Sequence, residues 1–70
     1  MGYEEDSKDP RISRLAKIAQ PFTDGFMYEK KYTQKEAFEA FVNHTKQNGL
    51  EEYSESELRR GFDLSIYINK

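Results

Sequence analysis

The sequence contains no cysteine, and this absence excludes several kinds of site at once. A disulfide, a thiolate metal ligand and a cysteine nucleophile are all ruled out. Because secreted domains of this size usually depend on disulfides, we expect a cytoplasmic location. No run approaches the roughly 18 apolar residues of a membrane span, and the acidic residues 1–9 do not resemble a signal peptide.

Other absences argue against catalysis. The four glycines are isolated, so the sequence has no glycine-rich phosphate loop. His44 is the single histidine, which leaves it without a second histidine for a metal site. A pocket of about 300 Å³ or more, as small ligands require, is also hard to build from so short a chain. We therefore expect no enzymatic activity, no cofactor and no metal, with His44 as a surface residue.

Aromatic and charged residues are plentiful in this chain of 70 residues. Five Phe and five Tyr supply large apolar areas, which favours a folded domain over a disordered one. Residues 1–8 are polar and acidic and lack periodicity, so we expect a flexible tail there. Residues 9–70 are then expected to form a single globular domain.

The first predicted helix begins after Asp9, a good N-cap residue that is followed by proline. Apolar residues recur at helical spacing up to Ala19, and Pro21 is expected to end the helix because proline disfavours the helical conformation of the residue before it. Asp24 and Gly25 then predict a turn. The loose alternation over residues 26–32 predicts a short strand.

Two capping boxes predict the next two helices. Thr33 and Glu36 have the spacing in which each side chain bonds the other's backbone amide, and Ser54 and Glu57 repeat it. Gly49 is expected to close the helix that starts after Thr33, by taking a left-handed conformation.

The segment after Gly61 has two interpretations. Alternating Leu64, Ile66 and Ile68 favour a strand, whereas a continued helix would place polar Ser65 and Asn69 on its apolar face. We prefer the strand. The predicted core is apolar throughout: Leu15, Ile18, Phe26, Phe38, Phe41, Val42, Leu58, Phe62, Leu64 and Ile66.

The resulting fold class is α+β: three helices with a short two-stranded β element, in the order α-β-α-α-β. In element order alone this is winged-helix-like, lacking the last wing strand. The alternative is an all-α helical bundle.

Charge is distributed unevenly along the chain. Residues 10–35 carry a net charge of +4, whereas residues 1–9 and 36–70 carry −3 each. A basic surface with tyrosines binds acidic protein patches or phosphate backbones. We therefore predict a partner-binding surface made of Arg11, Arg14, Lys17, Tyr28, Lys30 and Lys31. The alternative is that these residues form an ordinary solvated surface with no binding role.

The function expected from these features is recognition of a larger cytoplasmic protein by a small regulator, inhibitor or adaptor. Short cysteine-free chains are often of this kind, including many from phages and plasmids. The alternative is a winged-helix-like DNA-binding regulator that uses Arg59 and Arg60, although Glu55 and Glu57 would repel phosphate at the start of that helix. The opposed charges and the tyrosines are also compatible with a homodimer. We expect no membrane partner.

Overall fold

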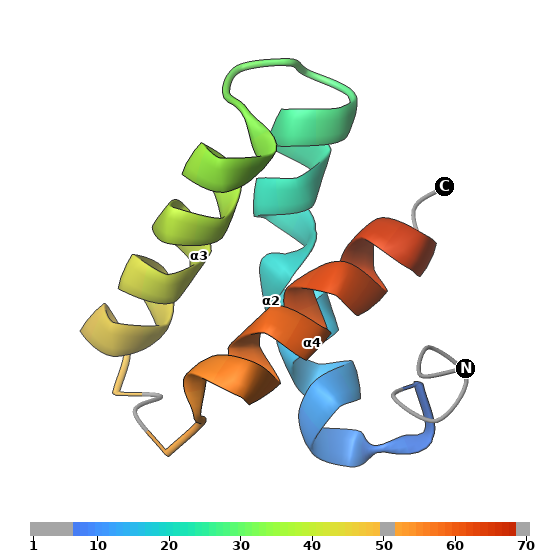
Figure 1. Cartoon of the computed structure of the whole chain (residues 1–70), viewed down its shortest axis with the longest axis vertical. Helices are drawn as coiled ribbons and strands as arrows, with labels where there is room; N and C mark the ends of the chain where they lie inside the picture. Colours follow the sequence, from blue (N-terminus) through green and yellow to red (C-terminus); the bar gives the residue numbers. More distant parts are fainter. Residues whose placement is uncertain (1–6, 50–51, 69–70) are drawn as a thin grey trace.

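The computed structural model describes residues 7–49 and 52–68, and this part of the chain holds three α-helices and no strand. They are α2 (Pro10–Met27), α3 (Gln34–Gln47) and α4 (Glu55–Ile68). In Figure 1, α4 crosses in front of α2, and α3 lies beside α2 on the left. Both α3 and α4 pack mainly on α2, so α2 is the central helix of a compact all-helical fold.

All three predicted helix starts are confirmed by hydrogen bonds. A backbone amide in the first turn of α2 donates to the Asp9 carboxylate at 3.0 Å. Thr33 and Glu36 form the capping box of α3, with N–O distances of 2.9 and 3.2 Å. Ser54 and Glu57 do the same for α4, at 3.0 and 3.2 Å. Residues three apart make these bonds, so the local sequence is sufficient to specify where each helix begins.

The predicted end of α3 is also confirmed. Gly49 has a φ of +73°, the left-handed conformation that glycine adopts without a steric penalty. The Asn48 side chain donates to the His44 carbonyl at 2.8 Å, which satisfies one of the free carbonyls at the helix end.

The expectation that Pro21 ends the first helix is wrong. α2 continues through Pro21 to Met27, although proline cannot donate a hydrogen bond to the carbonyl of Lys17. A proline inside a helix costs about 3 kcal/mol. The last turns of α2 offset this cost by packing, because Thr23 and Gly25 are fully or largely buried and Phe22 and Phe26 lie against the core.

The predicted turn at Asp24–Gly25 and the predicted strand over residues 26–32 are wrong as well. Gly25 lies inside α2, where the Tyr32 ring packs so closely that a β-carbon on Gly25 would lie 2.6 Å from Tyr32 Cζ. The glycine therefore permits a close contact and does not make a turn. The chain reverses after Met27 instead, with Lys30 at a φ of 53°.

The preferred strand over residues 64–69 is also contradicted, because α4 is helical through Ile68. Leu64 is fully buried but Ile68 is 62 % exposed, so burial does not alternate as a strand requires. Ser65, whose polarity argued against a helix, is buried and lies 2.9 Å from the hydroxyl of Thr23. The Thr23 hydroxyl in turn donates to the Gln20 carbonyl at 3.1 Å. Both buried hydroxyls therefore have hydrogen-bond partners, so their burial does not destabilise the fold. Asn69 lies outside the described residues.

The α+β fold class and its winged-helix-like order are therefore wrong, and the all-helical alternative is the fold observed. Five predicted core residues are buried: Leu15, Phe41, Leu58, Phe62 and Leu64. The other five are half-buried and pack against that cluster: Ile18, Phe26, Phe38, Val42 and Ile66. The buried apolar residues missing from the predicted core are mostly small or near helix starts: Ile12, Ala16, Ala19, Ala37 and Tyr53. Three polar residues are buried as well: Thr23, Thr45 and Ser65.

The flexible tail was predicted over residues 1–8, and residues 1–6 lie outside the described part of the chain.

Candidate functional site

The six residues of the predicted partner-binding surface do not form one patch. Arg11, Arg14 and Lys17 are spaced over about a third of the circumference of α2, at roughly 100° per residue. Lys17 also lies about 15 Å from Met27, at roughly 1.5 Å per residue along the helix. The structure therefore separates the basic residues of α2 from those of the loop that follows it.

Arg11 joins the start of α2 to the start of α4. Its Nε donates to Glu57 Oε2 at 2.9 Å and its Nη2 donates to Glu57 Oε1 at 3.1 Å, which makes a bidentate pair. Nη2 also lies 3.3 Å from the Glu52 carbonyl, and the guanidinium lies over the Tyr53 ring, 4.5 Å from its centroid. The charge of Arg11 is therefore largely satisfied within the chain, so Arg11 contributes little to a basic surface.

This pairing changes the acid–base behaviour of both partners. Hydrogen bonds from Arg11 and from the Ser54 backbone amide lower the pKa of Glu57 from 4.5 to about 2. The hydrogen bond to Glu57 likewise raises the pKa of Arg11. A carboxyl group with a lowered folded-state pKa stabilises the fold while it is ionised. The stabilisation from Glu57 is therefore complete above about pH 4.5 and is lost as the pH falls toward 2.

We predict that Glu57→Gln lowers the melting temperature at pH 7, because the amide cannot make the charged bidentate pair. The difference between wild type and variant should shrink as the pH falls from about 4.5 to 2, since wild-type Glu57 becomes protonated over that range. Thermal melts followed by circular dichroism at several pH values measure both effects.

The matched control is Glu39→Gln, the same chemical change at an exposed position of α3. It should change the melting temperature little, as most surface substitutions do. A Glu57→Gln difference that stayed constant down to pH 2 would contradict the role assigned to the pair.

Tyr28, Lys30 and Lys31 lie in the loop between α2 and α3. Tyr28 is 61 % exposed, and Lys31 Nζ lies 3.2 Å from the Glu29 carboxylate. A wide hollow beside this loop is lined by both lysines but also by Glu36, whose carboxylate caps α3. Acidic groups therefore offset the basic ones here, so this corner does not present a strongly basic surface.

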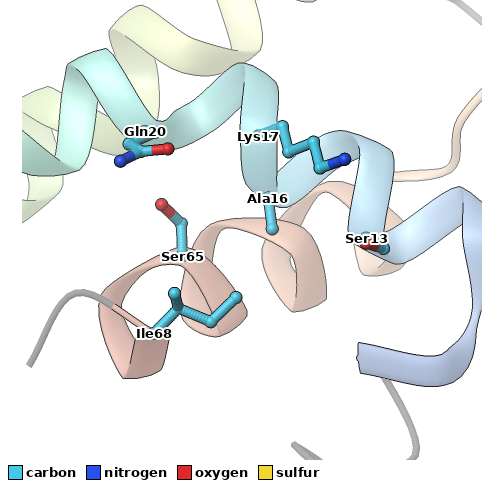
Figure 2. Close-up of a pocket in the computed structure, with 6 residues that line it drawn as sticks. All are labelled: Ser13, Ala16, Lys17, Gln20, Ser65 and Ile68. Carbon is cyan, nitrogen blue, oxygen red and sulfur yellow. The ribbon is translucent and has the colours of Figure 1, made fainter.

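Lys17 lines a groove between α2 and the last turns of α4 (Figure 2). We call this the α2–α4 groove and define it by six residues: Ser13, Ala16, Lys17, Gln20, Ser65 and Ile68. Figure 2 shows Ala16 pointing from α2 toward α4, with Ser65 and Ile68 on the facing helix. Most of the exposed area of the lining is apolar, although Ser13, Lys17, Gln20 and Ser65 are polar residues; the lining contains one cation and no anion.

The dimensions of the α2–α4 groove limit what it can hold. Its volume is about 190 Å³. Small-molecule pockets usually measure about 300–1,000 Å³, whereas a cavity of about 150 Å³ is enough for benzene. The groove thus has room for one apolar side chain of a partner but not for a typical cofactor.

The residues of the alternative nucleic-acid surface are Arg59 and Arg60, both exposed on α4. The Arg59 guanidinium lies over the Phe38 ring, 4.9 Å from its centroid, and its Nε is 3.8 Å from the Asp63 carboxylate. Arg59 therefore has an anionic and an aromatic neighbour within the chain. Glu55 and Glu57 lie in the first turn of the same helix, as expected from the sequence.

His44 lies at the surface near the end of α3. Its ring packs against Phe22, with centroids 5.5 Å apart, and its Nδ1 is 3.4 Å from the Asn48 amide. Among the described residues, no group of three His, Cys, Asp or Glu side chains is placed to hold a metal ion. None of the helices in the described ranges is long and apolar enough to cross a membrane.

Sequence reasoning identified only Lys17 of the six groove residues. Ile68 was assigned to a strand, which concealed that it lies beside α2. Ala16 and Ser65 are small residues on different helices. A small side chain lets another helix approach closely, so each of them is a weak sequence signal for a helix–helix contact. That signal could not identify the facing helix, because residues 16 and 65 come together only through the crossing of α2 and α4.

No family model matches the chain, and comparisons with curated proteins and with solved structures found no significant match.

Proposed function

We propose that this protein is a small, non-enzymatic recognition module that binds a larger protein and acts as its regulator, inhibitor or adaptor. The observation that carries the proposal is the α2–α4 groove, which combines an apolar lining with one basic residue at the surface of a small helical fold. Protein interfaces typically have an apolar centre with a polar rim, and single side chains inserted into such pockets dominate binding.

The size of the groove argues against small-molecule binding at this site. At about 190 Å³ the groove is smaller than most ligand pockets, but it can hold one anchoring side chain. Ile68, which is 62 % exposed at its edge, loses contact with water only when a partner covers it. Burying the part of Ile68 that is still exposed would contribute about 1–2 kcal/mol to binding, less than the value for a fully exposed side chain.

The proposal predicts a specific protein partner. We would attach a tag to the chain, capture its partners from a nuclease-treated lysate of its source cells, and identify them by mass spectrometry. One protein should be retained in near-equal amount at moderate salt, because apolar burial is insensitive to screening. The identified protein, purified separately, should then elute with the chain as a single complex on size exclusion.

Two outcomes would contradict the proposal. If no protein forms a complex with the purified chain, it is not a recognition module. If nucleic acid is captured when the nuclease is omitted, and its binding weakens steeply with salt, the nucleic-acid alternative is correct and Arg59 and Arg60 become the residues to mutate.

A further inference from the structure

We infer that the α2–α4 groove binds a segment of the partner that carries an aliphatic side chain next to a carboxylate. The inference rests on the proposed function and adds the site and the chemistry of the partner. The aliphatic side chain would lie between Ala16 and Ile68, and the carboxylate would pair with Lys17. A C-terminal segment that ends in an aliphatic residue has this chemistry.

The apolar half of the inference follows from the lining. Ala16 contributes its methyl group and Ile68 its exposed side chain, while the Ser65 hydroxyl is already engaged by Thr23. A hydroxyl that already has a partner does not need one from the ligand. The part of the groove between Ala16 and Ile68 therefore favours an aliphatic group, while the polar side chains of Ser13 and Gln20 lie along the rest of the lining.

The charged half follows from the distribution of charge along α2. From Pro10 to Gln20 this helix contains three basic residues and no acidic one. Arg11 is neutralised by Glu57, which leaves Arg14 and Lys17 exposed on this part of the helix. Lys17 is the one of these two that lines the groove, so it is the residue available to pair with a carboxylate there.

A small probe tests the site without knowledge of the partner. N-acetyl-leucine carries an aliphatic side chain and a carboxylate, whereas N-acetyl-leucinamide has the same side chain without the charge. Titration into the isotope-labelled chain, followed by nuclear magnetic resonance, should shift the amide signals of Ala16, Lys17 and Ser65. A probe of this size should bind with a Kd on the order of 1–10 mM.

The result expected is saturable binding of N-acetyl-leucine that is several-fold tighter than binding of the amide. Lys17→Met, which removes the charge and keeps most of the aliphatic stem, should abolish that difference. N-acetylglycine, which has the carboxylate without the side chain, should bind weakly. The inference is overturned if the shifts are absent or scattered over the surface, or if acid and amide bind equally to the wild-type chain.

A second experiment separates failure of the site from failure of the proposed function. With the captured partner in hand, Lys17→Glu and Ile68→Ser should each weaken binding by roughly tenfold or more, as loss of a central contact does. Lys46→Glu, the same charge reversal at an exposed position of α3, serves as the control and should have little effect. If the partner binds both groove variants as tightly as the wild type, the site is wrong while the recognition function stands. If N-acetyl-leucine binds in the groove but no partner forms a complex, the function is wrong while the site stands.

Discussion

Phe41→Ala is expected to lower the free energy of unfolding by about 3–5 kcal/mol, the usual cost of removing a buried phenylalanine ring. Phe41 is fully buried on α3, and its ring centroid lies 6.2 Å from that of Phe22 and 6.0 Å from that of Phe62. These two neighbours belong to α2 and α4, so one side chain links all three helices. A chain of this length has a total stability of roughly 3.5–10 kcal/mol, so the substitution removes a large part of it.

Thermal and urea unfolding followed by circular dichroism would measure this effect. A loss of this size corresponds to a fall in melting temperature of roughly 12–40 °C for a small domain. Ile68→Ala is the control, because Ile68 is an apolar residue that is 62 % exposed and its truncation should change stability by less than about 0.5 kcal/mol. A Phe41→Ala variant that melts within a few degrees of wild type would show that α3 does not pack through this ring.

Gly61→Ala is expected to destabilise the protein, although helix propensity alone predicts the opposite. Replacing glycine by alanine inside a helix usually stabilises it by about 1 kcal/mol. At position 61, however, the new β-carbon would lie 2.5 Å from Leu15 Cβ and 3.3 Å from the Leu15 carbonyl carbon. These atoms belong to or adjoin the α2 backbone and cannot rotate away, so α4 would have to move. Overpacking of this kind typically costs about 1–3 kcal/mol.

The sign of the change makes Gly61→Ala a decisive test of the α2–α4 crossing. Gly49→Ala is an informative comparison, because a β-carbon there meets no atom within 4 Å and the cost comes only from its φ of +73°. That cost should be about 1–2 kcal/mol. If Gly61→Ala raised the melting temperature, the close approach of α4 to Leu15 would be incorrect.

The thin body of the protein explains why a few contacts carry so much of its stability. The Cα trace measures 29 × 28 × 15 Å, so there is little depth in which to bury side chains. A domain of this size buries only about 60 % of the surface that its unfolded chain exposes. The core therefore depends on aromatic rings such as Phe41 and Phe62, and on the small residues that let the helices approach closely.

The helix starts were predictable because the groups that make them are close in sequence. Each capping box pairs two residues three positions apart, and Asp9 bonds the amide two positions later. Gly49 ends α3 through its own backbone conformation. None of these features requires a distant residue, so the local sequence contains all the information that they need.

The extent of α2 and α4 was not predictable in this way. Pro21 favours a helix end locally, but burial of the following turns against the core outweighs its cost. Ser65 argues against a buried helix face locally, but the Thr23 hydroxyl, which lies 42 residues earlier in the chain, satisfies it. In both cases the deciding contact joins residues far apart in the sequence.

The same distinction between local and long-range contacts applies to the candidate site. The sequence by itself determined that cysteine chemistry is excluded, where each helix begins, that aromatic residues supply much of the core, and that the middle of the chain is basic. Only the tertiary structure decided that Arg11 is neutralised by Glu57 and that Lys17 and Ile68 line the same groove. Charge and capping depend on the nearby sequence, whereas ion pairing and groove formation depend on how α4 crosses α2. That crossing is set by Gly61, Leu15 and the Thr23–Ser65 bond together, and no local pattern contains it.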